Sequence, residues 1–292
     1  MTGSLDLLVN AVISGLLLGG FYAAVSIGVA ISFGLLDIVN IAHPAFILLG
    51  SYVAYLANVY LGLDPILATV IAMPFFYLLG MALYQIYYVA FERRDDQSLR
   101  GLSFFFGILF IAEVGLILAF GVDLRSVQAW YVSGNLDLRV IELPWRLLVP
   151  FALGLVMVGG LQLFLSRTFV GRAIQAVAQD QQALRLMAAN PTKIKRIAFG
   201  ISLATASLGG AAMIIVIQAI EPSIGREYIG RIFAICVLGG LGSFPGMVIA
   251  AVTLGVVENL TATFLGPSWA PAVSFGVLLI TLAVRPSGIL GR

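Results

Sequence analysis

The chain is a succession of long apolar runs, and these runs restrict its fold more than any other feature of the sequence. About 20 apolar residues in a helix cross the hydrocarbon core of a bilayer, and several runs reach that length. The runs are continuously apolar, whereas the strands of a transmembrane barrel alternate apolar and polar residues. At 61% hydrophobic residues, the chain has more apolar surface than a soluble domain of this length could bury. The sequence therefore predicts an all-α integral membrane protein, a polytopic helical bundle.

Nine apolar elements are expected, in one transmembrane domain that covers residues 1–292. The start of the chain lacks the basic region of a signal peptide, so the first run is expected to stay in the membrane. Its Gly15 and Gly19 have the spacing that lets a neighbouring helix approach closely. The element at 228–238 is short and is expected to be re-entrant or tilted, which leaves eight or nine membrane helices, some of them broken. The elements are expected at about 7–32, 45–60, 66–91, 101–120, 146–165, 197–220, 228–238, 247–264 and 269–284.

Segment 167–196 is the charged exception among these runs. It carries six of the sixteen Lys and Arg residues of the chain. Apolar residues such as Ile174 recur along it at helical spacing, while Arg172 and Asp180 occupy other faces. Pro191 ends the pattern, because the residue before a proline is pushed out of helical geometry. The segment is predicted to be an amphipathic helix that lies in water or against a partner.

Loop charge predicts the orientation of the chain in the membrane. Eleven of the sixteen Lys and Arg residues fall in 92–100, in 167–196 and at the C-terminus. The positive-inside rule therefore places these parts in the cytoplasm, and nine crossings leave the N-terminus outside. Loop 121–145 is then extracytoplasmic, and its residues 127–132 and 136–141 are candidates for a short hairpin.

Two stretches interrupt the apolar pattern in the same way. Residues 40–44 and 239–246 each contain a proline and lead directly into a helix rich in small residues. Breaks at membrane depth are tolerated where they are buried in protein or line a wet cavity, and paired breaks can indicate a transport pathway. Asn40, His43 and Ser243 are therefore candidate path residues. The alternatives are close helix packing for the glycines and, for His43, a cap or a hydrogen bond to another helix.

Two carboxylates lie within predicted spans, Glu113 and Glu258, the latter next to Asn259. An ionised group is costly in lipid and should face protein or water, so these residues are also candidates for the path. The alternatives are a hydrogen bond at a subunit interface and, for Glu258, a position close to the outer membrane surface. Cys236 lies in an apolar run and is expected to be a buried structural thiol.

Three groups of residues carry a resemblance that extends, through the helix pattern, over nearly the whole chain. They are Gly20–Ala23, Gly28, Gly34, Asn40–His43 and Gly50–Tyr52; then Gly171–Ala173, Ala176, Ala178, Asp180, Ala183 and Asn190; and then Val237–Gly246, Gly255 and Glu258. With these residues the chain resembles the membrane permeases of branched-chain amino-acid ABC importers, in particular the shorter of their two permease types.

The resemblance implies that segment 167–196 contains a coupling helix that docks into a groove on an ATP-hydrolysing subunit. A short amphipathic helix with basic ends suits that role, because the anionic cytoplasmic leaflet attracts its cations. The alternative is an ordinary surface helix anchored by Arg and Lys. The residues expected to act in coupling are Gly171, Arg172, Ala178, Asp180, Ala183, Met187 and Asn190.

The resemblance also implies the partners: a second permease that makes a heterodimer, two ATP-binding cassette subunits and an extracytoplasmic binding protein. The sequence has no G-x-x-x-x-G-K-[ST] phosphate loop, so no cofactor is expected on this chain, and ATP and Mg²⁺ are expected on the ATPases. The chain would not itself be an enzyme. A net charge of +2 does not indicate a nucleic-acid partner. The expected location is the bacterial inner membrane, with the lipid bilayer as surroundings.

The substrate is predicted less sharply than the role. The family suggests branched-chain amino acids or related small organic solutes. After its Ala-His, the family usually has Gly and soon afterwards Glu, whereas this chain has Pro44, Ala45 and Phe46. At the end of the coupling segment, the usual Gly-Ile-Asn of the family is Ala188–Asn190 here. Aromatic or other carboxylates, amides and urea are therefore alternatives, and aromatic residues at 84–88 and 104–106 line either lipid or an aromatic route. The alternative functions are an ion-gradient-driven carrier and a channel or scaffold.

Overall fold

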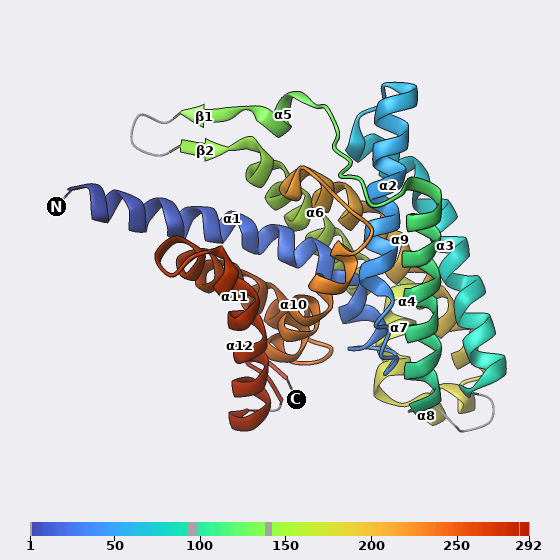
Figure 1. The fold of residues 1–292 in the computed structure, drawn as a ribbon. Helices are drawn as coiled ribbons and strands as arrows, with labels where there is room; N and C mark the ends of the chain where they lie inside the picture. The colour runs from blue at the N-terminus through green and yellow to red at the C-terminus, as the bar shows by residue number, and fades with distance from the viewer. Residues whose placement is uncertain (1, 93–98, 138–141, 286, 292) are drawn as a thin grey trace.

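The computed structural model describes residues 2–92, 99–137, 142–285 and 287–291, which are mostly helical (Figure 1). The elements are α1 Thr2–Ser32, α2 His43–Leu61, α3 Pro65–Ala90, α4 Leu99–Phe120, α5 Trp130–Ser133, β1 Asn135–Asp137, β2 Glu142–Pro144, α6 Trp145–Arg167, α7 Phe169–Gln179, α8 Gln181–Leu186, α9 Pro191–Ile217, α10 Ile224–Gly239, α11 Phe244–Phe264, η2 Pro267–Trp269 and α12 Ala270–Val284.

Eight helices within the described residues are long and apolar enough to cross a membrane. They are α1, α2, α3, α4, α6, α9, α11 and α12 with its η2 turn. The ninth predicted element is α10, whose 16 residues give about 24 Å of helix, short of a bilayer core of about 30 Å. The predictions of an all-α polytopic bundle and of one short element are confirmed.

Three of these helices begin with a side-chain cap followed by a proline. Asp64, Asn190 and Ser243 each accept a hydrogen bond from a backbone N–H in the first turn of α3, α9 and α11. A proline follows within the first two helical positions in all three cases, where its missing N–H costs nothing. Side-chain caps and prolines thus fix where these membrane helices start.

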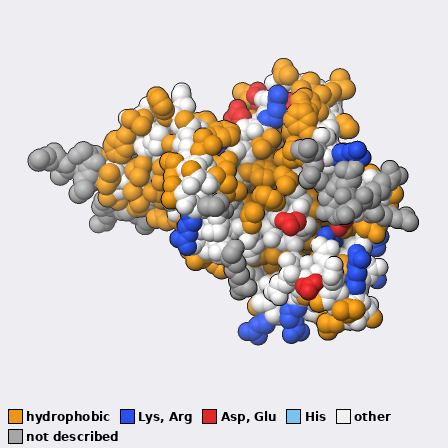
Figure 2. Space-filling model, turned by 90° about the horizontal axis from the view of Figure 1, so that it is seen from below, with side chains coloured by type: hydrophobic (Ala, Val, Ile, Leu, Met, Phe, Trp, Pro, Cys, Tyr) orange, Lys and Arg blue, Asp and Glu red, His pale blue; other side chains and the backbone are white. Residues whose placement is uncertain are grey.

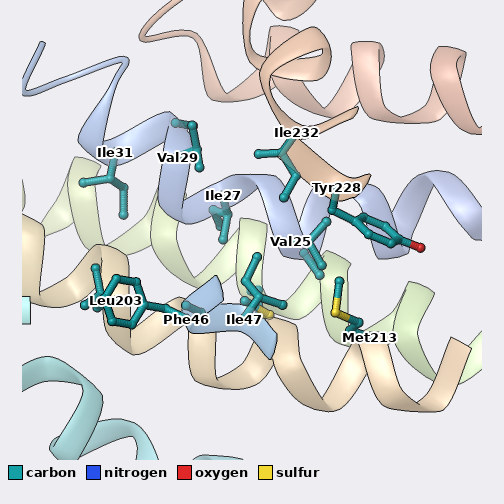
Figure 3. Close-up of a cluster of buried hydrophobic side chains, with 14 of the residues drawn as sticks. Val25, Ile27, Val29, Ile31, Phe46, Ile47, Leu203, Met213, Tyr228 and Ile232 are labelled. Carbon is teal, nitrogen blue, oxygen red and sulfur yellow. The ribbon is translucent and has the colours of Figure 1, made fainter. Parts of the chain in front are cut away.

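The core lies around α1 and α9. Helix α1 packs against α6, α9, α10 and α11, and α9 packs against α2 and α3. Figure 3 shows Ile27 of α1, Ile47 of α2, Met213 of α9 and Ile232 of α10 converging in this core, and all four are fully buried. Helix α12, by contrast, buries little of its surface within this chain.

Glycines allow α1 and α11 to cross closely. A Cβ on Gly15 or Gly19 of α1 would lie 2.6 Å or 2.5 Å from a backbone Cα of α11. On the α11 side, Gly255 faces the backbone of both glycines with equally little room. The predicted close approach at Gly15 and Gly19 is therefore confirmed, with α11 as the neighbour.

The connecting segments gather at two opposite ends of the bundle (Figure 1). At the β1–β2 end, Arg125 and Ile220 exchange both backbone hydrogen bonds, and Tyr131 donates a hydrogen bond to Asp64 at 2.6 Å. At the α7–α8 end lie residues 33–42, 168–190 and 240–243, together with the tail at 287–291. The polar loop expected at 92–100 falls partly outside the described residues.

The hairpin of the β1–β2 end differs from the prediction. Residues 130–133, expected to be extended, form the short helix α5, and the antiparallel pairing joins β1 to β2 instead. Tyr131 is buried and bonded to Asp64, and Trp130 packs on Trp145 at 5.5 Å between ring centroids. These contacts bend the chain before it reaches the strand. The part of the predicted second strand at 138–141 lies outside the described residues.

Candidate functional site

At the α7–α8 end, the break at 239–246 meets the segment that follows α1. A Cβ on Gly34 would lie 2.6 Å from the backbone nitrogen of Gly242, so the two backbones are in contact. Gly240 and Gly242 have φ angles of 94° and 81°, which favour glycine. Ser243 then caps α11 through the backbone N–H of Gly246 at 3.2 Å. Two segments about 200 residues apart in the chain thus form one unit.

A cavity of about 530 Å³ lies between this unit and α7. Gln162 of α6 and Gln175 and Gln179 of α7 line it together with Ser243. Sequence reasoning selected Ser243 but missed the three glutamines: Gln175 and Gln179 look like ordinary polar positions of an amphipathic helix, and Gln162 is a single polar residue in an apolar span. The cavity places the break of α11 next to the predicted coupling segment.

The C-terminal tail covers the same break. The backbone N–H of Ile289 donates to Leu238 at 2.8 Å, and Leu290 lines the cavity. Gly240 and Gly288 leave no room for a side chain. A Cβ on Gly240 would meet the backbone of the tail, and a Cβ on Gly288 would meet the backbone of Gly240. Sequence reasoning placed the tail at this end but did not predict the contact, for which the glycines of the tail are the only signal.

Asn40 and His43 lie in the neighbouring break and are both buried. Asn40 accepts a hydrogen bond from the backbone N–H of Ala42 at 3.1 Å, which shapes the entry to α2. The His43 ring fills the space beside Gly28, where a Cβ would lie 2.2 Å from its Cε1. Asn40 Nδ2 and His43 Nδ1 have no partner among the described residues. The ring thus packs against α1, and a role of His43 in the path stays a prediction.

The residues that replace the usual pattern after His43 are also buried. Pro44, Ala45 and Phe46 form the first turn of α2 inside the bundle, and Phe46 is part of the core in Figure 3. In the described structure these three residues contribute to the packing of α2 against its neighbours.

Glu258 is held by three donors. Its carboxylate pairs with Arg231 of α10, with 3.0 Å between Nε and Oε1, and accepts hydrogen bonds from the hydroxyls of Tyr22 and Ser274. These partners belong to α1, α10 and α12, so the carboxylate joins four helices. Asn259 donates a hydrogen bond to the backbone of Ala11 at 2.6 Å. Both residues fix α11 against its neighbours.

Glu113 lies apart from the other candidates, on α4. Its Oε1 pairs with Arg226 at 2.7 Å, and the Arg226 side chain is half exposed. Its Oε2 is buried and has no partner among the described residues. The structure therefore places these candidates separately: His43 lies beside Gly28 and Ser243 beside Gly242, and Glu113 is apart from the Glu258 group.

The predicted amphipathic helix is two helices, α7 and α8, with a break at Asp180. The Asp180 side chain accepts from the backbone N–H groups of Gln182 and Ala183 at 2.8 Å and 3.0 Å. Thr168 caps α7 in the same way through Gly171. A short acidic side chain competes for these N–H groups and starts a new helix, which periodicity alone does not show. The prediction of a single helix was wrong at this residue.

The faces of α7 and α8 are clearly divided. Ile174, Val177 and Leu184 are buried against the bundle, and a Cβ on Gly171 would lie 2.3 Å from the carbonyl oxygen of Phe164. The exposed side carries Arg172, Ala178, Asp180, Ala183, Met187 and Asn190. Met187 is 81% exposed, and Leu186 and Phe169 are exposed as well. Figure 2 views this end, where hydrophobic and basic side chains share the surface.

A buried ion pair lies beside the predicted coupling segment formed by α7 and α8. Lys195 of α9 and Glu92, just after α3, are 2.6 Å apart, with side chains 4% and 11% exposed. Tyr84 donates a hydrogen bond to Glu92 at 2.8 Å. Both members of the pair line a groove of about 740 Å³ that also contains Asp180. Sequence reasoning missed this pair, because nothing in the spacing connects residues so far apart.

The aromatic residues of this region mostly pack on one another. Tyr87 and Phe105 stack with ring centroids 5.4 Å apart, and Phe105 stacks on Phe199 at 5.8 Å. All three rings are buried, so they contact neither lipid nor a solute path, whereas Phe106 is 51% exposed. The cluster stiffens the junction of α3, α4 and α9.

Comparison with known proteins adds to this geometry. Residues 11–282 match the family of permease components of branched-chain amino acid transport systems. The chain belongs to this family. It is 28% identical to the BraD permease of Pseudomonas aeruginosa, over 96% of this chain and 94% of the relative. The same figures hold for LivH of Escherichia coli, and a LivM permease of Salmonella typhimurium is 33% identical over 43% of this chain and 29% of its own.

A solved structure shares the fold. PsaBC from Streptococcus pneumoniae in complex with Fab has a TM-score of 0.50 to this chain, over 96% of it and 92% of the solved chain. The identity is 14%, so the likeness concerns the fold alone.

Family membership confirms the resemblance found in the sequence. The chain is a multi-pass inner-membrane permease of an ABC importer and not an enzyme. Relatives of both the LivH and the LivM kind indicate a second permease in the system. Among the described residues there is no group of three or more His, Cys, Asp or Glu side chains that could hold a metal ion.

Proposed function

We propose that this permease forms half of a translocation pathway for branched-chain amino acids or related small solutes, and that α7 and α8 couple it to a cytoplasmic ATPase. The observation that carries the proposal is the cavity where α7 meets the break before α11 and the segment that follows α1. Movement of α7 would act directly on the start of α11 and on the end of α1. Such a two-state shift could open the pathway alternately to the two sides.

The proposal includes an orientation, supported by loop charge, and partners, supported by family membership. The α7–α8 end would face the cytoplasm, where two ATP-binding cassette subunits that hold ATP and Mg²⁺ contact the exposed side of the coupling segment. The N-terminus and the β1–β2 end would then face outward, toward an extracytoplasmic binding protein. Trp130, which is 71% exposed, offers an anchor there. A second permease would complete the pathway as a heterodimer.

The test of coupling is Arg172→Glu. Arg172 is exposed on α7, so the change should leave insertion intact while it reverses the charge presented to the ATPase. We expect uptake into proteoliposomes to fall at least tenfold, with basal ATP hydrolysis retained and its stimulation by loaded binding protein lost. Arg285→Glu is the matched control, because Arg285 is exposed at the end of α12 and does not line the cavity beside α7. Wild-type uptake and stimulation in Arg172→Glu would contradict the proposal.

The substrate is tested separately. Uptake of labelled leucine by the reconstituted complex should be inhibited by isoleucine and valine in excess. Inhibition by phenylalanine, short amides or urea, with none by the branched-chain amino acids, would assign the pathway to one of the other solute classes.

A further inference from the structure

A second groove, of about 690 Å³, lies between the end of α3 and the start of α9. We propose that this groove binds the phosphate headgroup of an anionic phospholipid. The residues that define it are Gln85 and Tyr88 of α3, Arg185 of α8, and Lys193 and Arg196 of α9. The proposal depends on α3 and α9 lying in the membrane and does not depend on the ATPase.

The charge of the groove favours an anion. Arg185, Lys193 and Arg196 contribute three cations, and none of the described residues that line the groove is Asp or Glu. The start of α9, a helix of 27 residues, adds the partial positive charge of its first turn beside Lys193. An anion placed here would meet both side-chain and backbone donors.

Arg196 is the residue that most needs a ligand. One of its terminal nitrogens donates to the Gln85 side-chain oxygen at 3.3 Å, a weak contact. Its Nε is buried and has no partner among the described residues. A buried N–H without an acceptor is costly, and a phosphate oxygen would satisfy it with a charge-assisted hydrogen bond.

The position of the groove favours a lipid over a soluble anion. Arg196 immediately precedes the apolar part of α9, and Gln85 lies just over a turn before the end of α3. Beside the groove, Ile86 and Val89 of α3 are 54% and 49% exposed and continue as an apolar surface along the helix. Tyr88, two residues before the end of α3, is of the residue type enriched at the level of the headgroups. Acyl chains could therefore lie along α3 while the phosphate enters the groove.

The experiment measures lipid retention. The purified importer complex is placed in nanodiscs of phosphatidylcholine with a minor fraction of phosphatidylglycerol, and retained lipid is counted by native mass spectrometry after release. We expect wild type to retain phosphatidylglycerol selectively. Lys193→Gln with Arg196→Gln should lower its apparent affinity by about fivefold for each cation removed. Arg167→Gln, which removes an exposed cation at the end of α6 outside the groove, should leave it unchanged.

Two further arms separate the other occupants. Soluble glycerol 3-phosphate at millimolar concentration should fail to displace the lipid, and displacement would assign the groove to a free phosphate compound. Co-purification of the ATPase should survive the double variant. Loss of the ATPase with unchanged lipid retention would overturn the proposal and assign the groove to the protein interface. Arg196→Lys, which keeps the charge and the fold, should retain most of the lipid.

Discussion

Glu258 and Glu113 look alike in the sequence, since each is a lone carboxylate in an apolar span. In the structure they differ in the number of partners that each carboxylate has. Glu258 is buried among four helices and receives hydrogen bonds from Tyr22, Arg231 and Ser274. Glu113 has one partner, the half-exposed Arg226, and its second oxygen is buried without a partner among the described residues.

The difference shows that a carboxylate within a span has more than one use. With three donors on its two buried oxygens, Glu258 has little capacity left for a solute and acts as a joint between helices. Glu113 retains an unused acceptor, which is what a polar lining for a path would provide. The number of donors around each carboxylate, more than its depth, therefore separates structural from functional candidates.

The largest effect is expected for Glu258→Ala. The change leaves the Arg231 guanidinium buried and unpaired, at a cost of about 3–5 kcal/mol. We expect the thermal midpoint of the purified complex to fall steeply and little folded protein to be recovered. Ser274→Ala, which removes one of three donors, should cost clearly less in the same assay. Equal losses in the two variants would show that the carboxylate is not shared as described.

An intermediate effect is expected for Lys195→Ala at the α7–α8 end. The change removes a charge-assisted bond to Glu92, worth about 2 kcal/mol, although Tyr84 continues to donate to that carboxylate. Denaturation of the complex followed by tryptophan fluorescence would measure the loss. Adding Glu92→Gln should recover part of it, because no buried charge then lacks a partner. A double variant less stable than Lys195→Ala would contradict the coupling between the two residues.

The sequence predicted the membrane helices well because each depends on a local quantity, the length of an apolar run. Side-chain caps are equally local, and the Asn190-Pro191 stop is where α9 begins. The Asp180 break was missed because a single side-chain cap outweighs an otherwise regular apolar period.

Contacts between distant segments could not be predicted in this way. Gly34 touches Gly242, and Tyr22 reaches Glu258 across 236 positions of the chain. Only the packing of α1 against α10 and α11 brings these residues together. The candidate site was therefore predicted as separate pieces, of which Ser243 and the coupling segment adjoin a common cavity.

Glu113→Gln is expected to have the smallest effect on stability and a selective effect on uptake. Glu113→Gln keeps the shape and an acceptor for Arg226, and the pair it weakens is partly exposed, so the loss should be at most about 1 kcal/mol. If the unpaired oxygen serves the path, uptake should fall severalfold while the thermal midpoint stays near wild type. Arg226→Ala serves as the control, since it removes the partner and leaves the carboxylate. Glu113→Gln with full uptake would place Glu113 with Glu258 among the structural carboxylates.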